Sequence, residues 1–511
     1  MAPRDWFARG NDLPGAPGLR ALVVSEDEWR EAALDLAAAG GRLVALWASP
    51  ENDAPRVHAA LLAEHKGIVL TLSMADPAAP FPGIEDLFPA AARMQRAITD
   101  LSGLRSTGPD TRPWLRHTAW PQGYRPLVDP PRVAAPAEAA IDVYDFVRVE
   151  GEGVHEIAVG PVHAGTIEPG HFRFSVVGEK VLRLEERLGY VHKGIEQRFT
   201  QLPILEAHRL AARVSGDSAV AFSWAYCQAL EGISSCEIPR RAAWLRALYL
   251  ELERMANHLG DLGALGNDAG FAFGLMQFGR LKEQLLRATQ DALGERYLME
   301  AIVPGGTRYD LTRPNLLSLG RCVREIEHEA RTLRTIYDEH AGVRDRFTGA
   351  GTVTAELAAR LGLTGLAGRA SGQAFDLRSD LPCEPYSQFS VKKIVHNEGD
   401  VAARVAVRFD ELEESCRLIQ RILGALPEGP HRTQVRVPAD GTFGAGLIEG
   451  WRGPVCVALE AGPSGTIRRC HAHDPSWQNW PVLEHAIIGN IVPDFPLINK
   501  SFNLSYSGHD S

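Results

Sequence analysis

The segment from residue 107 to residue 136 carries seven prolines, and this feature most constrains how the chain can fold. Proline fixes φ and lacks a backbone N–H donor, so such a stretch forms neither a core strand nor a helix. We expect an extended, semi-rigid strap between two folded parts. The strap predicts a first domain at 1–106, a Pro-rich linker at 107–141 and a second domain at 142–511.

The composition is that of a folded globular protein. The chain has 511 residues, of which 45% are hydrophobic and 23% charged, and these values exclude a largely disordered chain. A formal charge of -10 provides no basic stripe to replace phosphate counterions, so we expect no nucleic-acid partner. No apolar run reaches the roughly 18 residues of a spanning helix, and the first residues lack the apolar core of a secretory signal. We therefore expect a cytoplasmic protein whose membrane contact runs through partner subunits.

Hydrophobic patterns predict a mixed α+β fold. Residues 43–50 and 66–74 are typical of buried strands, and 25–40 is typical of a helix with an acidic first turn. From 142 to about 185 the pattern is strand-like, with hairpin turns expected at GEG and VGEK. From about 186 to 430 helical patterns dominate, and the chain returns to strands near its end.

Two helices are predicted most clearly. In residues 238–262 the apolar side chains recur at steps of four and three, and Pro239 stands where a first helical turn tolerates it. A second long helix is expected at 399–426. These patterns give an α+β protein with a helical core, but they do not identify a chemistry.

The cysteines are scattered and none forms a CxxC pair. The seven residues are Cys227, Cys236, Cys322, Cys383, Cys416, Cys456 and Cys470. Such a set is typical of reduced, mostly buried thiols. A thiolate-bound metal or an iron–sulfur cluster needs clustered cysteines, so we expect neither in this chain.

Ordered blocks of the sequence resemble a known family. GPVHAGTIEPGHFRFSVVGEKVLRLEERLGYVHKGIE (160–196) resembles the opening of the large subunit of membrane-bound energy-converting NiFe hydrogenases, and of the related quinone-site (D-type, 49-kDa) subunit of complex I. Matching blocks follow at ERMANHLGDLGALGNDAG, VPGGTRYDL, RASGQAFDLRSDLPCEPYSQF, GDVAARVAVRFDELEES, EGWRGPV and GNIVPDFPLINKSF. The run FPGIEDLFPAAARMQRAITDLSGL (81–104) resembles its C-type (30-kDa) partner in complex I. The whole chain thus resembles a fusion of the two subunits, as in formate hydrogenlyase.

The resemblance implies an architecture and an assembly. It implies a small N-terminal α/β docking domain, then a hydrogenase-large-subunit-like domain with a helical core and peripheral β-strands. It implies a peripheral subunit on the cytoplasmic side of the inner membrane. The implied partners are an iron–sulfur small subunit of the complex I B-type, a ferredoxin-like iron–sulfur subunit, and antiporter-like and other membrane subunits. Iron–sulfur clusters would belong to those partners, a quinone is the candidate acceptor, and this chain would hold no metal.

The metal-ligand positions of the hydrogenases are changed in this sequence. A NiFe hydrogenase holds its metals with four thiolates from two CxxC pairs, and the matching positions here are Ser215, Ser218, Ser505 and Gly508. A neutral hydroxyl is a poor donor for low-valent nickel or iron, and glycine has no donor. We predict that no NiFe centre forms, as in complex I.

The resemblance implies three candidate catalytic residues. His163 matches a histidine at the quinone head-group of complex I, where an imidazole can bond a carbonyl or deliver a proton. Asp268 matches the acid that pairs with that histidine. Glu196 matches a proton-relay glutamate of the hydrogenases, for which a partly shielded carboxyl of raised pKa is suited. The structural alternatives are a histidine bonded to turn backbone, a turn-forming acid and a carboxylate stabilised at a helix start.

The candidate substrate-binding residues are Arg213, Ser215, Ser218 and Arg378. Arg213 stands where complex I carries the tyrosine of its quinone site, and a permanently charged guanidinium cannot donate a proton as a phenol does. This departure argues against ordinary quinone chemistry. Asp376, Arg378 and Asp380 alternate in sign, so they either line a polar cavity or lock a loop by ion pairs, and we favour the loop.

Three functions are compatible with these observations. The first is an electron-transfer and coupling subunit of a complex I-like assembly, with a quinone-type acceptor site in the former metal pocket. The second is a redox-silent scaffold that bridges an iron–sulfur subunit to the membrane arm. The third is a hydrogenase with unusual ligands, which the missing thiols argue against.

Overall fold

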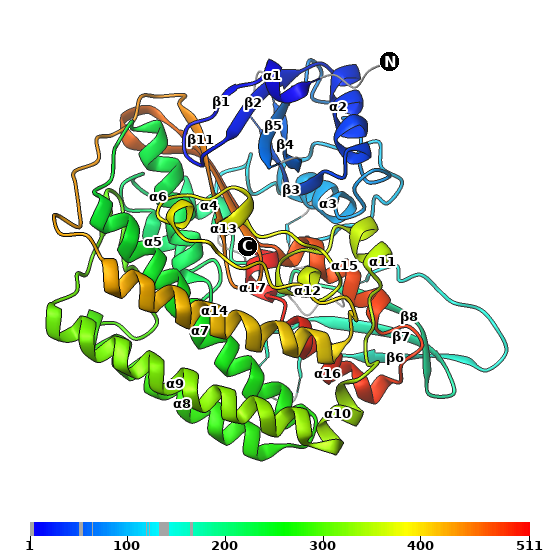
Figure 1. Cartoon of the computed structure of the whole chain (residues 1–511). Helices are drawn as coiled ribbons and strands as arrows, with labels where there is room; N and C mark the ends of the chain where they lie inside the picture. Colours follow the sequence, from blue (N-terminus) through cyan, green and yellow to red (C-terminus); the bar gives the residue numbers. More distant parts are fainter. Residues whose placement is uncertain are drawn as a thin grey trace.

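The computed structural model describes residues 5–50, 55–63, 65–118, 120–121, 123–131, 143–163 and 167–511. A five-stranded sheet near the N-terminus lies beside a bundle of long helices, and the C-terminus ends in the middle of the molecule (Figure 1). The predicted α+β class is confirmed.

The N-terminal sheet has the strand order β1-β2-β5-β4-β3. Its strands are β1 (Asn11–Asp12), β2 (Leu19–Val24), β3 (Arg42–Ser49), β4 (Arg56–Ala63) and β5 (Lys66–Ser73). β2 and β5 are parallel, and the other pairs are antiparallel. Two of these strands, β3 and β5, were predicted. Helix α1 (Trp6–Arg9) precedes the sheet, and α2 (Glu26–Ala38) and α3 (Ala91–Ser102) follow within this part of the chain.

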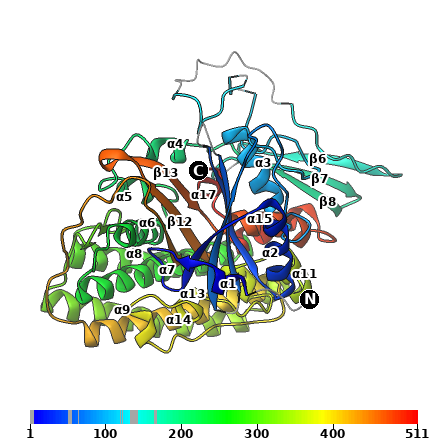
Figure 2. The same cartoon turned by 90° about the horizontal axis from the view of Figure 1, so that it is seen from above.

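The strands β3, β4 and β5 are buried on both faces of this sheet, which explains why they are apolar along most of their length. Along β5, Ile68 and Leu70 join the core that includes α2 and α3, whereas Val69 faces a second cluster. That second cluster contains Ala445 of the C-terminal sheet. Figure 2 shows the N-terminal strands between α2 and α3 on one side and β12 and β13 on the other.

The C-terminal sheet is antiparallel with the order β11-β12-β13. Its strands are β11 (Phe443–Glu449), β12 (Pro454–Ala461) and β13 (Ile467–His473), and the last two were predicted. Helix α6 (Ala219–Ile233) packs on β11 and β12. Gly446 permits this contact, because a Cβ there would lie 1.9 Å from the carbonyl oxygen of Ala225 on α6.

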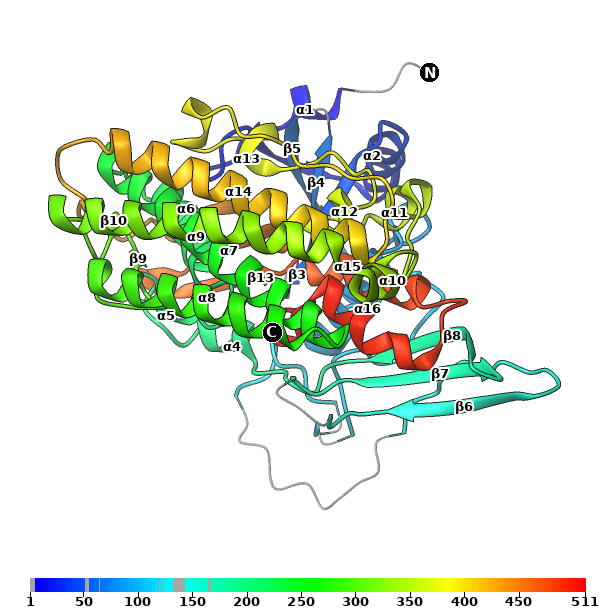
Figure 3. The ribbon, with the colours of Figure 1, turned by 60° about the horizontal axis from the view of Figure 1, so that its bottom comes forward.

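The helical core is formed by four long helices that pack side by side (Figure 3). They are α7 (Arg240–Asp268), α8 (Ala272–Leu293), α9 (Arg313–Glu339) and α14 (Val401–Ala425). Helices α7 and α14 were predicted, and α7 begins directly after Pro239 as expected. The shorter helices are α4 (Ile195–Phe199), α5 (His208–Ala211), α10 (Ala341–Phe347), α11 (Ala355–Leu361), α12 (Gly365–Arg369), α13 (Leu377–Asp380), α15 (Ser476–Ala486), α16 (Phe495–Phe502) and α17 (Tyr506–Asp510). A small ribbon joins β9 (Ile302–Val303) to β10 (Gly306–Thr307).

A third sheet extends away from the bundle along one edge (Figure 3). It pairs β6 (Val154–Val159) with β7 (His171–Val177), and β7 with β8 (Lys180–Arg187). The VGEK turn joins β7 and β8 as predicted. No strand precedes the GEG turn within 143–150, so the hairpin expected there is wrong; β6 pairs instead with β7 across a longer connection.

The described part of the Pro-rich strap contains neither helix nor strand. It is nevertheless anchored in the core. Trp114 is 1% exposed, and its indole Nε1 donates a hydrogen bond of 3.2 Å to His509 Nε2 on α17. Residues 119, 122 and 132–141 of the expected linker lie outside the described residues.

Among the described residues, no helix combines the length and the apolar character that crossing a bilayer requires.

Candidate functional site

The turn before α6 and the start of α17 meet in the interior. Ser215 Oγ and Ser505 Oγ lie 2.9 Å apart, and Ser505 accepts a hydrogen bond of 2.9 Å from the backbone N–H of Gly508. Ser218 Oγ joins the same group by donating a 3.4 Å hydrogen bond to Asp217. The structure therefore brings together the positions that the sequence related to metal ligands.

Asp217 and Arg452 form the charged centre of this group. Arg452 Nη1 donates a hydrogen bond of 2.6 Å to Asp217 Oδ1, and Ser215 Oγ donates to the same oxygen at 2.8 Å. Burial opposes ionisation of Asp217, but the charge and hydrogen bonds of Arg452 outweigh it and lower the pKa of the carboxyl to about 2. The pair therefore stays ionised at neutral pH. Arg452 lies in the EGWRGPV block and Asp217 in the segment RVSGDS (213–218). The sequence did not reveal that these two segments meet.

Asp474 occupies the space beside Gly508. The Asp474 side chain is buried, and within the described chain its Oδ2 has no hydrogen-bond partner. A Cβ placed on Gly508 would lie 2.5 Å from this oxygen and 2.8 Å from Ser505 Oγ. Burial raises the pKa of the Asp474 carboxyl. A side chain at position 508 therefore has no room unless Asp474 moves.

This donor set does not fit a nickel–iron centre. The hydroxyls of Ser215 and Ser505 are already hydrogen-bonded to each other, and Asp474 takes the space next to Gly508. Oxygen donors of this kind suit hard cations rather than low-valent nickel and iron. Within the residues described, no group of three or more His, Cys, Asp or Glu side chains is arranged to hold a metal ion.

Glu196 lies on α4, buried against β13. Arg469 Nη2 donates a hydrogen bond of 2.9 Å to its carboxylate, and His471 Nδ1 contacts the other oxygen. Burial alone would raise the pKa of Glu196, but Arg469 and His471 together lower it to about 2. The raised pKa expected for a proton-relay glutamate is therefore not found.

His163 and Asp268 are not brought into contact. His163 Nε2 lies 2.9 Å from the carbonyl oxygen of Gly170, so this nitrogen carries the proton and donates to local backbone. Asp268 is an exposed residue at the end of α7. Partial desolvation of its carboxyl raises the pKa, and the charge of Lys500 opposes the rise. The contact of His163 matches its structural alternative, and the catalytic roles of both residues stay predictions.

Arg213 lies at the surface rather than in a pocket. Its side chain is 50% exposed, and Nη2 forms an ion pair of 2.6 Å with Glu300. Nη1 donates to the carbonyl oxygen of Arg209 at 2.6 Å. These contacts leave the guanidinium bound to protein groups on both sides.

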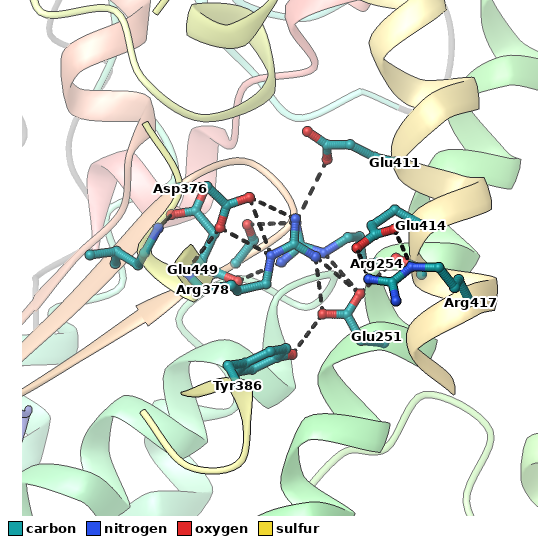
Figure 4. A network of polar contacts seen from close by, with 12 residues as sticks. Glu251, Arg254, Asp376, Arg378, Tyr386, Glu411, Glu414, Arg417 and Glu449 are labelled. Carbon is teal, nitrogen blue, oxygen red and sulfur yellow. Dashed lines mark hydrogen bonds and ion pairs between the residues drawn. The ribbon is translucent and has the colours of Figure 1, made fainter. Parts of the chain in front are cut away.

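Arg378 belongs to a buried network of ion pairs between α7, α13 and α14 (Figure 4). It forms ion pairs with Asp376 at 2.7 Å and with Glu251 at 3.1 Å. Tyr386 and Ser415 also donate hydrogen bonds to Glu251, at 2.6 and 2.7 Å. Asp376 and Arg378 therefore hold the loop by ion pairs, as the structural alternative predicted.

A second arginine, which the sequence did not single out, shares this network. Arg369 is fully buried and forms ion pairs with Glu411 at 2.7 Å and with Glu449 at 2.8 Å. Glu411 also approaches His258 on α7 at 3.2 Å. The network thus joins α7, α12 and α14 to the C-terminal sheet.

Comparisons with known proteins relate the chain to respiratory complexes. The sequence profile of the family described as respiratory-chain NADH dehydrogenase, 49 Kd subunit, matches residues 268–442. Formate hydrogenlyase subunit 5 of Escherichia coli (strain K12) is 31% identical over 439 residues, which cover 84% of this chain and 77% of that protein. The C/D subunit of NADH-quinone oxidoreductase from Bacteroides thetaiotaomicron is 29% identical, with 77% of this chain and 78% of that protein covered.

A solved structure shares the fold. A chain of the membrane-bound sulfane sulfur reductase, an archaeal respiratory membrane complex, superposes with a TM-score of 0.67 at 24% identity. The match covers 70% of this chain and 99% of that chain.

Proposed function

Because this chain belongs to the family of the 49-kDa subunit of respiratory-chain NADH dehydrogenase, which it shares with formate hydrogenlyase subunit 5, we propose that it is a peripheral subunit of a membrane-associated, complex I-like oxidoreductase. It would lie on the cytoplasmic side of the inner membrane. An iron–sulfur small subunit would pack against it and deliver electrons to it. A ferredoxin-like subunit would pass electrons to that small subunit, and antiporter-like membrane subunits would complete the assembly.

The domain organisation that we propose has three parts. Residues 1–106 form a docking domain like the 30-kDa subunit of complex I, 107–141 form the linker, and 142–511 form the domain like the 49-kDa subunit. The β-sheet packing at Val69 and Ala445 supports a fixed contact between the first and third parts.

We further propose that this subunit works without a nickel–iron centre. The observation that carries this proposal is the polar group at the former ligand positions, in which Ser215 contacts Ser505 at 2.9 Å and Asp217 is ion-paired with Arg452. The hydrogen bonds between the hydroxyls and the ion pair of Asp217 with Arg452 balance the charge of that carboxylate without a metal.

The test is metal analysis of the complete complex. We expect purified complex to contain iron from the partner clusters, nickel far below one atom per complex, and no hydrogen evolution with reduced dye. Formate hydrogenlyase prepared in the same way serves as the nickel-containing control. Stoichiometric nickel that copurifies with this chain would overturn the proposal.

The remaining choice is between a quinone-type site and a redox-silent scaffold. His163 and Asp268 would serve the acceptor site, whereas the hydrogen bond of His163 to the backbone of Gly170 supports the scaffold.

Alanine variants at His163 and Asp268 distinguish these two functions. Because both side chains lie outside the buried core, we expect each variant to assemble normally. If the chain is a scaffold, electron-transfer turnover stays within about twofold of wild type. Turnover that falls more than about tenfold in an intact complex, roughly 1.4 kcal/mol in the barrier, would instead assign an acceptor site. Glu339→Ala, at the exposed end of α9, is the matched control.

A further inference from the structure

A cavity of about 120 Å³ lies between α7, α8 and the turn before α6. Its lining includes Gly216, Asp217, Glu253, Asn257 and Lys282. Gly216 and the lining residue Tyr297 are exposed, so solvent reaches this space from the surface. The cavity therefore connects water to the back of the polar group around Asp217.

Glu253 is the buried carboxyl in this lining, with 7% of its surface exposed. Its Oε2 accepts a hydrogen bond of 2.7 Å from the backbone N–H of Val220, and Oε1 accepts one of 3.3 Å from Ala221, both at the start of α6. These donors orient the carboxyl, but they bring no full positive charge to it.

The charges around Glu253 do not balance an ionised carboxylate. Among the described residues, no arginine or lysine forms an ion pair with it, whereas Glu251, which lies just before it on α7, is paired with Arg378 at 3.1 Å. Arg452 is already bound to Asp217.

The other charged groups come from each neighbouring segment. The turn before α6 provides the negative Asp217, α7 provides Arg254, and α8 and the segment after it provide Lys282 and Arg296 at the cavity. Arg254 donates to the carbonyl oxygens of Glu449 and Gly450, and Arg296 is paired with Glu283. An ionised Glu253 would thus place a second negative charge beside Asp217.

We propose that Glu253 is an exchangeable proton site, a carboxyl that is neutral at neutral pH and that takes up and releases one proton through the cavity between α7 and α8. Uptake is a single proton transfer from cavity water to a carboxylate oxygen, and it moves no electron. Burial and the Asp217 charge agree with this assignment, since they raise the pKa of Glu253 to about 8 despite the two backbone hydrogen bonds. The inference goes beyond the proposed function, because it needs neither an acceptor nor a partner subunit.

The first test is the pH dependence of stability in the full chain. A carboxyl whose pKa is raised by folding contributes stability that is complete below the pKa of the unfolded chain and is lost as pH rises through the folded pKa. The unfolding constant of wild type relative to Glu253→Gln should therefore rise about tenfold per pH unit from about pH 5, and level off above the folded pKa of about 8. For the control Glu339→Gln, at an exposed position, the ratio of the wild-type unfolding constant to that of the variant should not change with pH.

The second test detects the proton directly, first in wild-type protein and then in variants. Infrared difference spectra of wild-type protein between pH 6.5 and pH 9.5 should show a protonated-carboxyl band from Glu253 that disappears at high pH, beside any bands from other buried carboxyls whose pKa is raised, such as Glu186 and Asp474. The band should be missing in Glu253→Gln and shifted in Glu253→Asp. The variant Ala256→Leu, which fills the cavity, should slow the exchange of the Glu253 carboxyl proton for deuterium in D₂O, seen as a slower shift of its infrared band. A wild-type spectrum without a titrating carboxyl band, or a Glu253→Gln spectrum with the same titrating bands as wild type, would overturn the assignment.

Discussion

Replacing Arg369 with methionine is expected to destabilise the protein by about 3–5 kcal/mol, because the buried carboxylates of Glu411 and Glu449 lose the charge that balances them. The guanidinium is fully buried between two carboxylates at 2.7 and 2.8 Å, so water cannot replace it. Burial and the nearby Asp376 already raise the pKa of Glu449 to about 6, so the positive charges around this carboxylate do not fully offset its burial even with Arg369 present. Urea unfolding at pH 7 measures the loss.

Two controls separate charge balance from packing. Arg287→Ala removes an ion pair with Glu283 on the surface of α8, where the arginine side chain is 74% exposed, and it should leave the unfolding midpoint unchanged. Arg369→Met combined with Glu411→Gln and Glu449→Gln should regain much of the lost stability, since no unpaired charge then remains buried. An Arg369→Met protein as stable as wild type would show that the network contributes little to folding.

Local signals in the sequence were sufficient for elements that begin at clear caps. Helix α2 was predicted from its acidic first turn, and the structure adds a reciprocal capping box between Ser25 and Glu28 at its start. Strand β4 (Arg56–Ala63) was missed, because an alanine- and leucine-rich run has no period-2 alternation when both sheet faces are buried. The second buried face comes from β11–β13, almost 400 residues later.

The sequence predicted only part of the candidate site, because several contacts join segments that lie far apart in the chain. Resemblance related the positions of Ser215 and Ser505, which the structure joins at 2.9 Å. Arg452, by contrast, reaches Asp217 across 235 residues, and no local pattern encodes that distance. Glu196 shows the same limit, because its partners Arg469 and His471 come from β13 and reverse the direction of the pKa shift that burial alone implies.

The residues around Ser215, Ser505 and Gly508 fit one another closely. Glycine at 508 makes room for the Asp474 carboxylate, and the serine hydroxyls satisfy each other. Placing a cysteine side chain at position 508 should therefore lower the stability of the protein, whether or not a metal is present.

Gly508→Cys is expected to destabilise the chain by about 1–3 kcal/mol through overpacking. The new Cβ would lie 2.5 Å from Asp474 Oδ2 and 2.8 Å from Ser505 Oγ, both held in a buried site where neighbours cannot easily shift. Asp474→Ala removes the first obstacle, so the double variant should recover part of the loss, with a coupling energy of roughly 0.5–3 kcal/mol in a double-mutant cycle. Thermal and urea unfolding of the four proteins measure that coupling.

Asp474→Asn is the matched control for this cycle, because it removes the charge but keeps the shape of the side chain. It should give no rescue of Gly508→Cys if steric exclusion is the cause. Rescue by asparagine equal to that by alanine would instead identify the buried charge of Asp474 as the obstacle. Additive effects in both cycles would mean that Gly508 and Asp474 are energetically independent, which would contradict the steric explanation.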